Sequence, residues 1–266
     1  MSRVEDREFI QSLAKGLAVI ESFGPQMPAM TLSEVARKTK LSPGSARRVL
    51  RTLQRLGYMQ SDGQRFALAP RTLQLGYAYL ASQPMTSLVQ PRLSQLVQKL
   101  EGSCSVSVLD GTDVVYLARA TGKGLTRDYM SVGTRFPAHA TSPGKILLAA
   151  LPIAELKRRL SGRKLEALTP HTISTPEKLY AALDDARKKG WAVNDQETSL
   201  GHRSVAVPIT IDDRVVAALG IGCIAARVTL KVMVEDYLPK LKAAAAAISE
   251  TLAASDRVGE TIKPLR

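Results

Sequence analysis

The segment from Thr31 to Leu68 constrains the fold of this chain more than any other part, because helix starts and stops follow one another there in a fixed order. It reads TLSEVARKTKLSPGSARRVLRTLQRLGYMQSDGQRFAL. Thr31 and Glu34 have the spacing of a capping box, in which two side chains satisfy free amides at a helix start. Ser42 before Pro43 predicts a second helix start a few residues later. Two short helices joined by a tight turn are therefore expected.

The second of these helices is followed by a hairpin. Gly57 predicts the end of the helix, and residues 61–63 (Ser-Asp-Gly) predict a tight turn between short strands at 58–60 and 65–68. Two helices followed by such a hairpin form a winged helix-turn-helix, which inserts its second helix into a DNA major groove.

One face of the second helix is basic. On a period of 3.6 residues, Ala46, Val49, Leu50 and Leu53 share an apolar stripe, and four arginines occupy the opposite face. Arginine suits DNA because its planar guanidinium can donate two hydrogen bonds to one guanine. A solvated helix face is the simpler alternative, but no acidic residue lies between Arg37 and Asp62. The candidate DNA-binding residues are Ser42, Ser45, Arg47, Arg48, Arg51, Thr52, Arg55 and Arg65.

These candidates are expected to divide by position. Side chains near the start of a recognition helix usually reach base edges, which favours Ser45, Arg47 and Arg48, with Thr52 as a further candidate, for bases or nearby phosphates. Arg51 and Arg55 are expected to meet phosphates, and Arg65 an adjacent groove or the backbone. The net charge of +13 extends over the whole chain and favours polyanionic partners, although a basic enzyme could have the same total.

Composition and motifs exclude several other classes of protein. The chain has two cysteines, Cys104 and Cys223, and no CxxC, so we expect buried free thiols and no disulfide framework. The three histidines lack metal-ligand spacing, and neither a GxSxG elbow nor a complete phosphate-binding loop occurs. We therefore expect no catalytic residue, no metal and no cofactor. The charged start and the absence of long apolar runs predict a cytoplasmic protein without a membrane span.

The remaining sequence predicts an α+β protein of several parts. Helices are expected at 9–23, 88–100, 142–151, 176–189 and 229–254, the last with a possible break at Pro239, and a further apolar helical stretch opens at Pro70 and closes at Pro84. Strands are expected at 103–109, 114–119, 204–211 and 214–222. The predicted parts are residues 1–70, the winged helix-turn-helix; 71–84, a linker helix; 85–254, an effector and oligomerisation domain; and 255–266, a disordered tail.

Five stretches of the chain, in the same order, resemble the IclR family of bacterial transcription regulators. They are SLAKGLAVIESF, TLSEVARKTKLSPGSARRVLRTLQRLGY, FALAPRTLQLGYAYLAS, AHATSPGKILLAAL and GWAVNDQETSLGHRSVAVPI. The resemblance implies an N-terminal winged helix-turn-helix, a C-terminal effector domain with a GAF/PAS-like sheet, and dimers that pair into tetramers. Within the family, FIQSLAKGLAVIESF is similar to the start of regulators of protocatechuate and 4-hydroxybenzoate catabolism.

The resemblance also implies an effector pocket between the TSPGK loop and the GHRSVAV strand. Carried over position by position, its residues are Leu125, Phe136, Thr141, Ser142, Pro143, Asn194, His202 and Ser204. Family members often carry an acid at position 194 and a cysteine at position 204, so this chain has less negative charge there, which favours an anionic effector. The helix that opens at Ser142 would offer free amides to a carboxylate. Arg119, Arg127 and Arg203 are further candidate carboxylate partners, although surface salt bridges would explain them equally well.

Three functions remain open from the sequence. The first is a DNA-binding regulator that responds to a small organic acid of the aromatic or a related carboxylic class and binds a two-fold operator as a dimer or tetramer. The second is a ligand-insensitive or architectural DNA-binding protein whose C-terminal part only oligomerises. The third, which the absence of catalytic motifs disfavours, is an enzyme with an appended DNA-binding unit.

Overall fold

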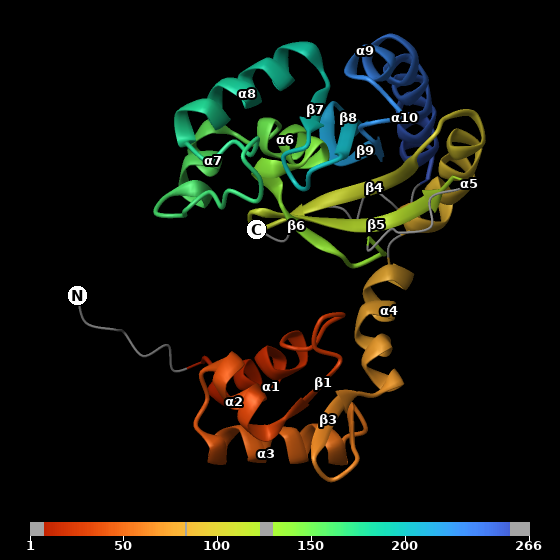
Figure 1. Ribbon diagram of the computed structural model, residues 1–266. Helices are drawn as coiled ribbons and strands as arrows, with labels where there is room; N and C mark the ends of the chain where they lie inside the picture. The colour runs from red at the N-terminus through yellow and green to blue at the C-terminus, as the bar shows by residue number, and fades with distance from the viewer. Residues whose placement is uncertain (1–7, 83, 123–129, 256–266) are drawn as a thin grey trace. The chain divides into compact units, whose positions relative to one another are not determined.

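A computed structural model of the chain describes residues 8–82, 84–122 and 130–255. The chain divides into two compact units, Met1–Tyr79 and Leu80–Arg266, and each is described by itself (Figure 1). Within the described ranges, no helix is both long and apolar enough to cross a membrane.

The first unit is a small helical bundle with a three-stranded sheet. Its order β1-β3-β2 is antiparallel throughout. Strand β1 was not predicted from the sequence. Its three residues are too few to show an alternation of polar and apolar side chains, and the strand forms by pairing with β3. The elements are α1 (Gln11–Glu21), β1 (Ala29–Thr31), α2 (Leu32–Thr39), α3 (Pro43–Arg55), β2 (Met59–Ser61) and β3 (Arg65–Leu68).

The predicted helix signals of this unit are confirmed. Thr31 and Glu34 form a complete capping box at the start of α2, and Ser42 caps α3 with Pro43 in the first turn. Gly57 takes φ +78°, a left-handed conformation that favours glycine and ends the helix. The unit's core contains Val19, Met30, Val35, Leu50, Leu53 and Met59.

A short 3-10 turn, Pro70–Thr72, leads into helix α4 (Leu73–Ser82), and α5 (Pro84–Lys99) follows. Helix α4 ends at Ser82, before Pro84, as expected, and Pro84 itself stands in the first turn of α5. The first turn of a helix tolerates proline because an amide there has no partner within the helix.

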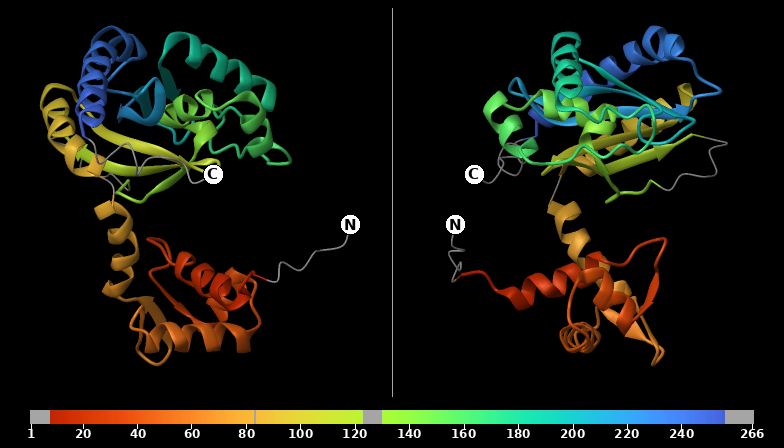
Figure 2. Two further views of the ribbon diagram at one scale, coloured as in Figure 1. Left: turned by 180° about the vertical axis from the view of Figure 1, so that it is seen from behind. Right: turned by 60° about the vertical axis from the view of Figure 1, so that its left-hand side comes forward.

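The second unit is built on a six-stranded antiparallel sheet, order β6-β5-β4-β9-β8-β7, as the α+β prediction required (Figure 2). The central pairing of β4 with β9 joins segments that lie far apart in the chain. The strands are β4 (Ser103–Asp110), β5 (Asp113–Thr121), β6 (Arg135–Pro137), β7 (Ala192–Asp195), β8 (His202–Ile211) and β9 (Arg214–Ile224).

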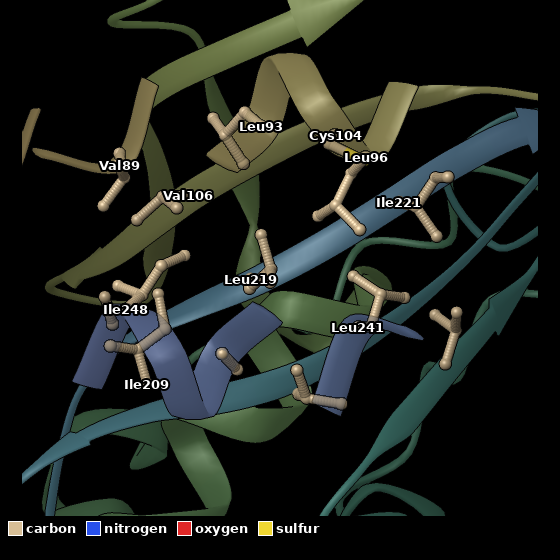
Figure 3. Packing of buried hydrophobic residues seen from close by; sticks show 14 of the residues in the cluster. Val89, Leu93, Leu96, Cys104, Val106, Ile209, Leu219, Ile221, Leu241 and Ile248 are labelled. Atoms are coloured by element: carbon tan, nitrogen blue, oxygen red, sulfur yellow. The ribbon is translucent and has the colours of Figure 1, made fainter. Parts of the chain in front are cut away.

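Helices cover both faces of this sheet. Helices α5 and α10 (Leu238–Ala253) pack on one face, where Val106, Leu219 and Ile221 meet Leu93 and Leu241 (Figure 3). On the other face lie a short 3-10 turn, Ala138–Ala140, and three helices, α6 (Ser142–Ala149), α7 (Ile153–Leu160) and α8 (Pro176–Lys189). Strands β6 and β7 and helix α7 were not predicted from the sequence.

The expected break in the C-terminal helix takes a defined form. Helix α9 (Leu230–Val232) passes through a π-helical turn, Met233–Tyr237, into α10. The cause is local, because Pro239 has no amide hydrogen to donate to the carbonyl four residues before it, and the regular hydrogen-bond ladder is interrupted there. Of the predicted tail, residues 256–266 lie outside the described ranges.

The two cysteines are free and buried, as predicted. Burial raises the pKa of both the Cys104 and the Cys223 thiol to about 12. The reactive thiolate is therefore scarce at neutral pH, in agreement with the structural role expected for both residues.

Candidate functional site

The first candidate site is the outer face of α3 in the first unit. Ala46, Leu50 and Leu53 are buried in the unit's core, and this fixes the opposite face of the helix toward solvent. The four arginines of that face, Arg47, Arg48, Arg51 and Arg55, are all exposed. In the part of the chain that the structure describes, none of them forms an ion pair.

The polar candidates of α3 are partly engaged within the helix. The Ser42 hydroxyl oxygen accepts a hydrogen bond from the Ser45 amide at 3.3 Å and thereby caps the helix. The Thr52 hydroxyl donates to the Arg48 carbonyl at 2.8 Å. Ser45 is half-buried. These residues are therefore more restricted in what they can contact than the arginines are.

The hairpin that follows α3 is closed by Asp62. Its Oδ1 accepts hydrogen bonds from the Gln64 amide at 2.9 Å and the Arg65 amide at 2.7 Å. These bonds lower the pKa of the Asp62 carboxyl. Arg65 itself is exposed at the start of β3.

The second candidate site is a cavity of about 730 Å³ in the second unit. Seven of the eight predicted effector residues line it, and they come from four separate segments; Leu125 lies outside the described residues, as does Arg127. The seven are Phe136, Thr141, Ser142, Pro143, Asn194, His202 and Ser204. The structure thus brings together side chains that the resemblance grouped.

The floor of the cavity is a stretch of sheet made of small residues. Across adjacent strands, Ser103 lies opposite Gly222, which lies opposite Ser204. In the next row, Ser105 lies opposite Gly220. Serine and glycine side chains leave space above the sheet, which explains why the cavity lies at this position.

A β-bulge brings an arginine to the same face. The pairing of β4 with β5 shifts between Val106 and Ser107, so that Arg119 lies opposite Ser105 while Tyr116 lies opposite Ser107. Arg119 and Tyr116 both line the cavity. The Arg119 guanidinium donates to the Met130 carbonyl at 2.6 Å, and burial lowers its pKa.

The cavity also has aromatic walls. The rings of Tyr116 and Phe136 meet edge to face, with centroids 6.0 Å apart. Burial raises the pKa of the Tyr116 phenol to about 12, so this side chain is neutral at physiological pH. Edge-to-face contact is a favourable arrangement of two aromatic rings, so the pair forms one continuous apolar wall.

The start of α6 forms another wall, but it offers fewer free amides than the sequence analysis expected. The Thr141 amide donates to the Ala138 carbonyl at 3.3 Å, and the Gly144 amide donates to Thr141 Oγ1 at 3.0 Å. Pro143 has no amide hydrogen. Among the amides of this turn, the Ser142 amide therefore remains available to a ligand. The Ser142 hydroxyl lies 2.7 Å from the Ser204 hydroxyl.

The loop between β7 and β8 completes the cavity through residues 198–201. Asn194 Oδ1 accepts from the Glu197 amide at 2.8 Å, and Asn194 Nδ2 donates to Thr198 Oγ1 at 3.0 Å. Thr198 Oγ1 lies 3.4 Å from His202 Nδ1. Asn194 is thus occupied mainly in holding the loop.

His202 is held in its neutral form. Burial lowers its pKa, and the positive charge of Arg119 lowers it further. Its Nε2 atom is buried and has no hydrogen-bond partner among the described residues. The side chain therefore belongs to the polar wall of the cavity without a positive charge of its own.

Other candidate side chains lie elsewhere. Arg203 is engaged by Asp195 at 2.7 Å and by the Val228 carbonyl at 2.9 Å, and it does not line the cavity. His139 is buried with its Nε2 3.0 Å from the Glu166 carbonyl, and it does not line the cavity. Among the described residues, no cluster of three or more His, Cys, Asp or Glu side chains could hold a metal ion.

Sequence reasoning missed most of the floor and the β7–β8 loop. The missed lining residues include Ser103, Ser105, Tyr116, Thr198, Gly220 and Gly222. A signal for the floor does exist, because SCSVSV at 103–108 alternates serine with apolar residues and so marks one polar face of a buried strand.

Two family models match the chain. The model described as IclR helix-turn-helix domain matches residues 12–63, and the model described as bacterial transcriptional regulator IclR C-terminal matches residues 77–250. These matches cover both units.

Individual relatives agree with the family models. The Pca regulon regulatory protein of Pseudomonas putida is 40% identical over 241 residues, which are 90% of this chain and 83% of the relative. A crystal structure of a transcriptional regulator from Rhodococcus sp. RHA1 has 43% identity and a TM-score of 0.78, covering 92% of this chain and 99% of that one. A homologue from Microbacterium hydrocarbonoxydans, solved in complex with 4-hydroxybenzoate, has 26% identity and a TM-score of 0.76, covering 92% and 100%.

Proposed function

We propose, from the premise that this chain belongs to the IclR family of bacterial transcriptional regulators, that an aromatic carboxylic acid bound in its C-terminal cavity changes its binding to operator DNA. The observation that carries the proposal is the cavity itself, in which residues from all six strands of the sheet, the start of α6 and the β7–β8 loop form polar and aromatic walls. The proposed domains are residues 1–70 for DNA, 71–84 as a linker and 85–254 for the effector.

On the DNA side, α3 acts as the recognition helix. Arg47 and Arg48 lie in its first half and would read base edges, whereas Arg51 and Arg55 lie nearer its end and would bind phosphates. Ser42, Ser45, Thr52 and Arg65 would add contacts at the edges of this surface. The exposure of all four helix arginines supports this assignment. Such a protein would act in the cytoplasm, where operator DNA is accessible.

The chemistry of the cavity favours a small aromatic acid. Tyr116 and Phe136 supply an aromatic wall, Arg119 supplies a positive charge, and the Ser142–Ser204 pair can bond a carboxylate or a ring hydroxyl. The names of similar proteins point the same way, since one relative is a Pca regulon regulator and one homologue was crystallised with 4-hydroxybenzoate. Leu125, carried over from the family, remains part of the proposed site.

The protein is further proposed to act as a homodimer or tetramer. Exposed apolar side chains on α1 and α4 would be covered by a second copy, which would remove their apolar surface from water. They are Leu13, Leu17, Leu73, Leu75, Tyr77 and Tyr79. A dimer would present two recognition helices to a two-fold operator.

A thermal-shift series tests the effector assignment. We expect 4-hydroxybenzoate or protocatechuate to raise the melting temperature of the purified protein, because a ligand that binds only the folded state stabilises it. The uncharged 4-hydroxybenzyl alcohol serves as the control and should have little effect. If neither acid stabilises the protein and neither changes operator binding, the ligand-insensitive alternative is favoured.

A further inference from the structure

A buried ion pair lies behind the cavity and does not line it. Lys145 belongs to α6 and Glu197 to the loop between β7 and β8, and their exposed fractions are 5% and 6%. The Lys145 ammonium donates to the Glu197 carboxylate and also to the Val193 carbonyl, the latter at 3.0 Å. One lysine thus ties a helix to two points on the opposite segment.

The two segments that the pair joins are two walls of the cavity. Helix α6 begins with Ser142 and Pro143, which line the cavity, and Lys145 follows within the same turn. On the other side, the Glu197 amide donates to Asn194, which in turn donates to Thr198. The position of Glu197 therefore determines the position of two lining residues.

The loop that carries Glu197 is held at further points. The Thr172 hydroxyl donates to the Glu197 carbonyl at 2.6 Å, and the Thr169 hydroxyl donates to the Gln196 carbonyl at 2.8 Å. Gln196 takes φ +61°, a left-handed conformation that is unfavourable for a residue other than glycine. Such a backbone persists only where its surroundings fix it.

Stability alone does not account for a charged pair at this position. Removing two charges from water carries a desolvation cost that their attraction repays only in part, and apolar pairs of similar volume are often equally stable. An apolar pair at positions 145 and 197, however, would form neither the directed bond between the two side chains nor the bond to the Val193 carbonyl. What the ion pair adds is a defined geometry between two walls.

We propose that Lys145 and Glu197 are positioning residues for effector binding: their buried ion pair fixes the α6 wall of the cavity relative to the Asn194–Thr198 wall. The proposal rests on the function proposed above for the cavity. It assigns no ligand contact to either residue. Its consequence is that effector affinity and the stability of the fold depend on this pair in different ways.

The test replaces both members of the pair by apolar side chains of similar size, as Lys145→Met with Glu197→Leu. We expect a folded protein whose melting temperature stays close to that of the wild type, while its affinity for 4-hydroxybenzoate in calorimetry falls by about tenfold or more. A matched control, Lys189→Met with Asp185→Leu, removes an exposed ion pair of α8 and should leave the affinity unchanged.

Hydrogen exchange gives a second measurement that needs no effector. In the double variant, amides of residues 194–202 should exchange faster, whereas those of β9 should not change. A folded double variant that binds 4-hydroxybenzoate as tightly as the wild type, or that shows unchanged exchange at residues 194–202, contradicts the proposal. Should the double variant not fold, Glu197→Gln, which keeps the side-chain shape and removes the ion pair, is judged by the same two measurements.

The two proposals fail in distinguishable ways. A wild-type protein that binds neither 4-hydroxybenzoate nor protocatechuate contradicts the effector assignment, and the exchange of residues 194–202 then decides the role of the ion pair. If the wild type binds an acid and the folded double variant binds it equally tightly, only the positioning role is contradicted.

Discussion

The imidazole of His202 lies so close to Gly222 that a Cβ atom at position 222 would come within 2.6 Å of His202 Nε2. Gly222 lies in the floor of the cavity, between Ser103 and Ser204 on the neighbouring strands. Its lack of a side chain therefore provides the space that the His202 ring occupies.

Gly222→Ala is expected to displace the His202 ring and to weaken effector binding. The backbone at Gly222 is not left-handed, so the substitution acts through this contact and not through backbone strain. The matched control is Gly220→Ala, whose Cβ would approach protein atoms no closer than 3.4 Å. The imidazole NMR signals of His202 should shift in the first variant only. An unchanged His202 spectrum in Gly222→Ala would show that the ring tolerates the added atom.

The buried, neutral His202 should make stability depend on pH. Because its pKa is lowered from 6.5 in the folded protein, the unfolded chain binds its proton first as the pH falls. The free energy of unfolding should therefore decrease as the pH is lowered through about 6.5. Denaturant titrations at about pH 7.5 and about pH 5.5 measure this decrease, and His202→Gln should reduce it. If the free energy of unfolding of His202→Gln decreases as much as that of the wild type, other titratable groups cause the pH dependence.

Arg48→Ala should weaken binding to the specific operator by about 1–3 kcal/mol if Arg48 reads a base. The salt dependence of binding would then change little, whereas Arg55→Ala should lower its slope because a phosphate contact is lost. Fluorescence anisotropy at several salt concentrations separates the two effects. Arg214→Ala, an exposed arginine of the second unit, is the control for lost charge. Wild-type affinity in Arg48→Ala would mean that the reading face lies elsewhere.

Ser204→Leu should abolish the response to effector and leave operator binding intact. Ser204 is buried in the cavity floor, and a leucine there would project into the space between the sheet and Ser142. Ser204→Ala keeps the space and removes one hydroxyl, so it should weaken effector binding by a smaller amount, about 0.5–1.5 kcal/mol. A dose response of Ser204→Leu equal to the wild type would exclude Ser204 from the site.

Arg71→Ala should lower the stability of the first unit and weaken operator binding slightly. The Arg71 guanidinium donates to the Leu56 carbonyl at 2.8 Å, just after α3, and lies 5.4 Å from the centre of the Tyr58 ring. Since the side chain is exposed, the expected loss is small, about 0.5–1 kcal/mol. A lysine has no planar guanidinium and cannot keep both contacts, so the stability of Arg71→Lys should lie between that of the wild type and that of Arg71→Ala. Chemical denaturation of the variants measures the difference, and equal stability of all three would rule out this contribution.

The local part of the fold was predictable from the sequence. The capping residues Thr31 and Ser42 and the helix-ending Gly57 act within a few residues of themselves, so their pattern specifies the two helices directly. Strands β1 and β7 were not predictable in the same way. Each is three or four residues long and exists because another strand pairs with it.

The cavity was predictable only in part, for a physical reason. The family resemblance identified Ser142, Asn194 and Ser204, but the floor depends on β4 lying beside β9, a pairing that no local pattern specifies. Alternation alone would also misplace Arg119 relative to Tyr116, because the bulge beside them shifts the register by one residue. The amides of α6 were expected to be free because the bond from Gly144 to Thr141 was not foreseen.

The most direct test of the whole account is a calorimetric titration of the full-length protein with 4-hydroxybenzoate, made with and without a saturating operator duplex. The two titrations should give different affinities, because an effector that alters DNA binding must have its own affinity altered by DNA to the same extent. Equal affinities in the two titrations would contradict this coupling.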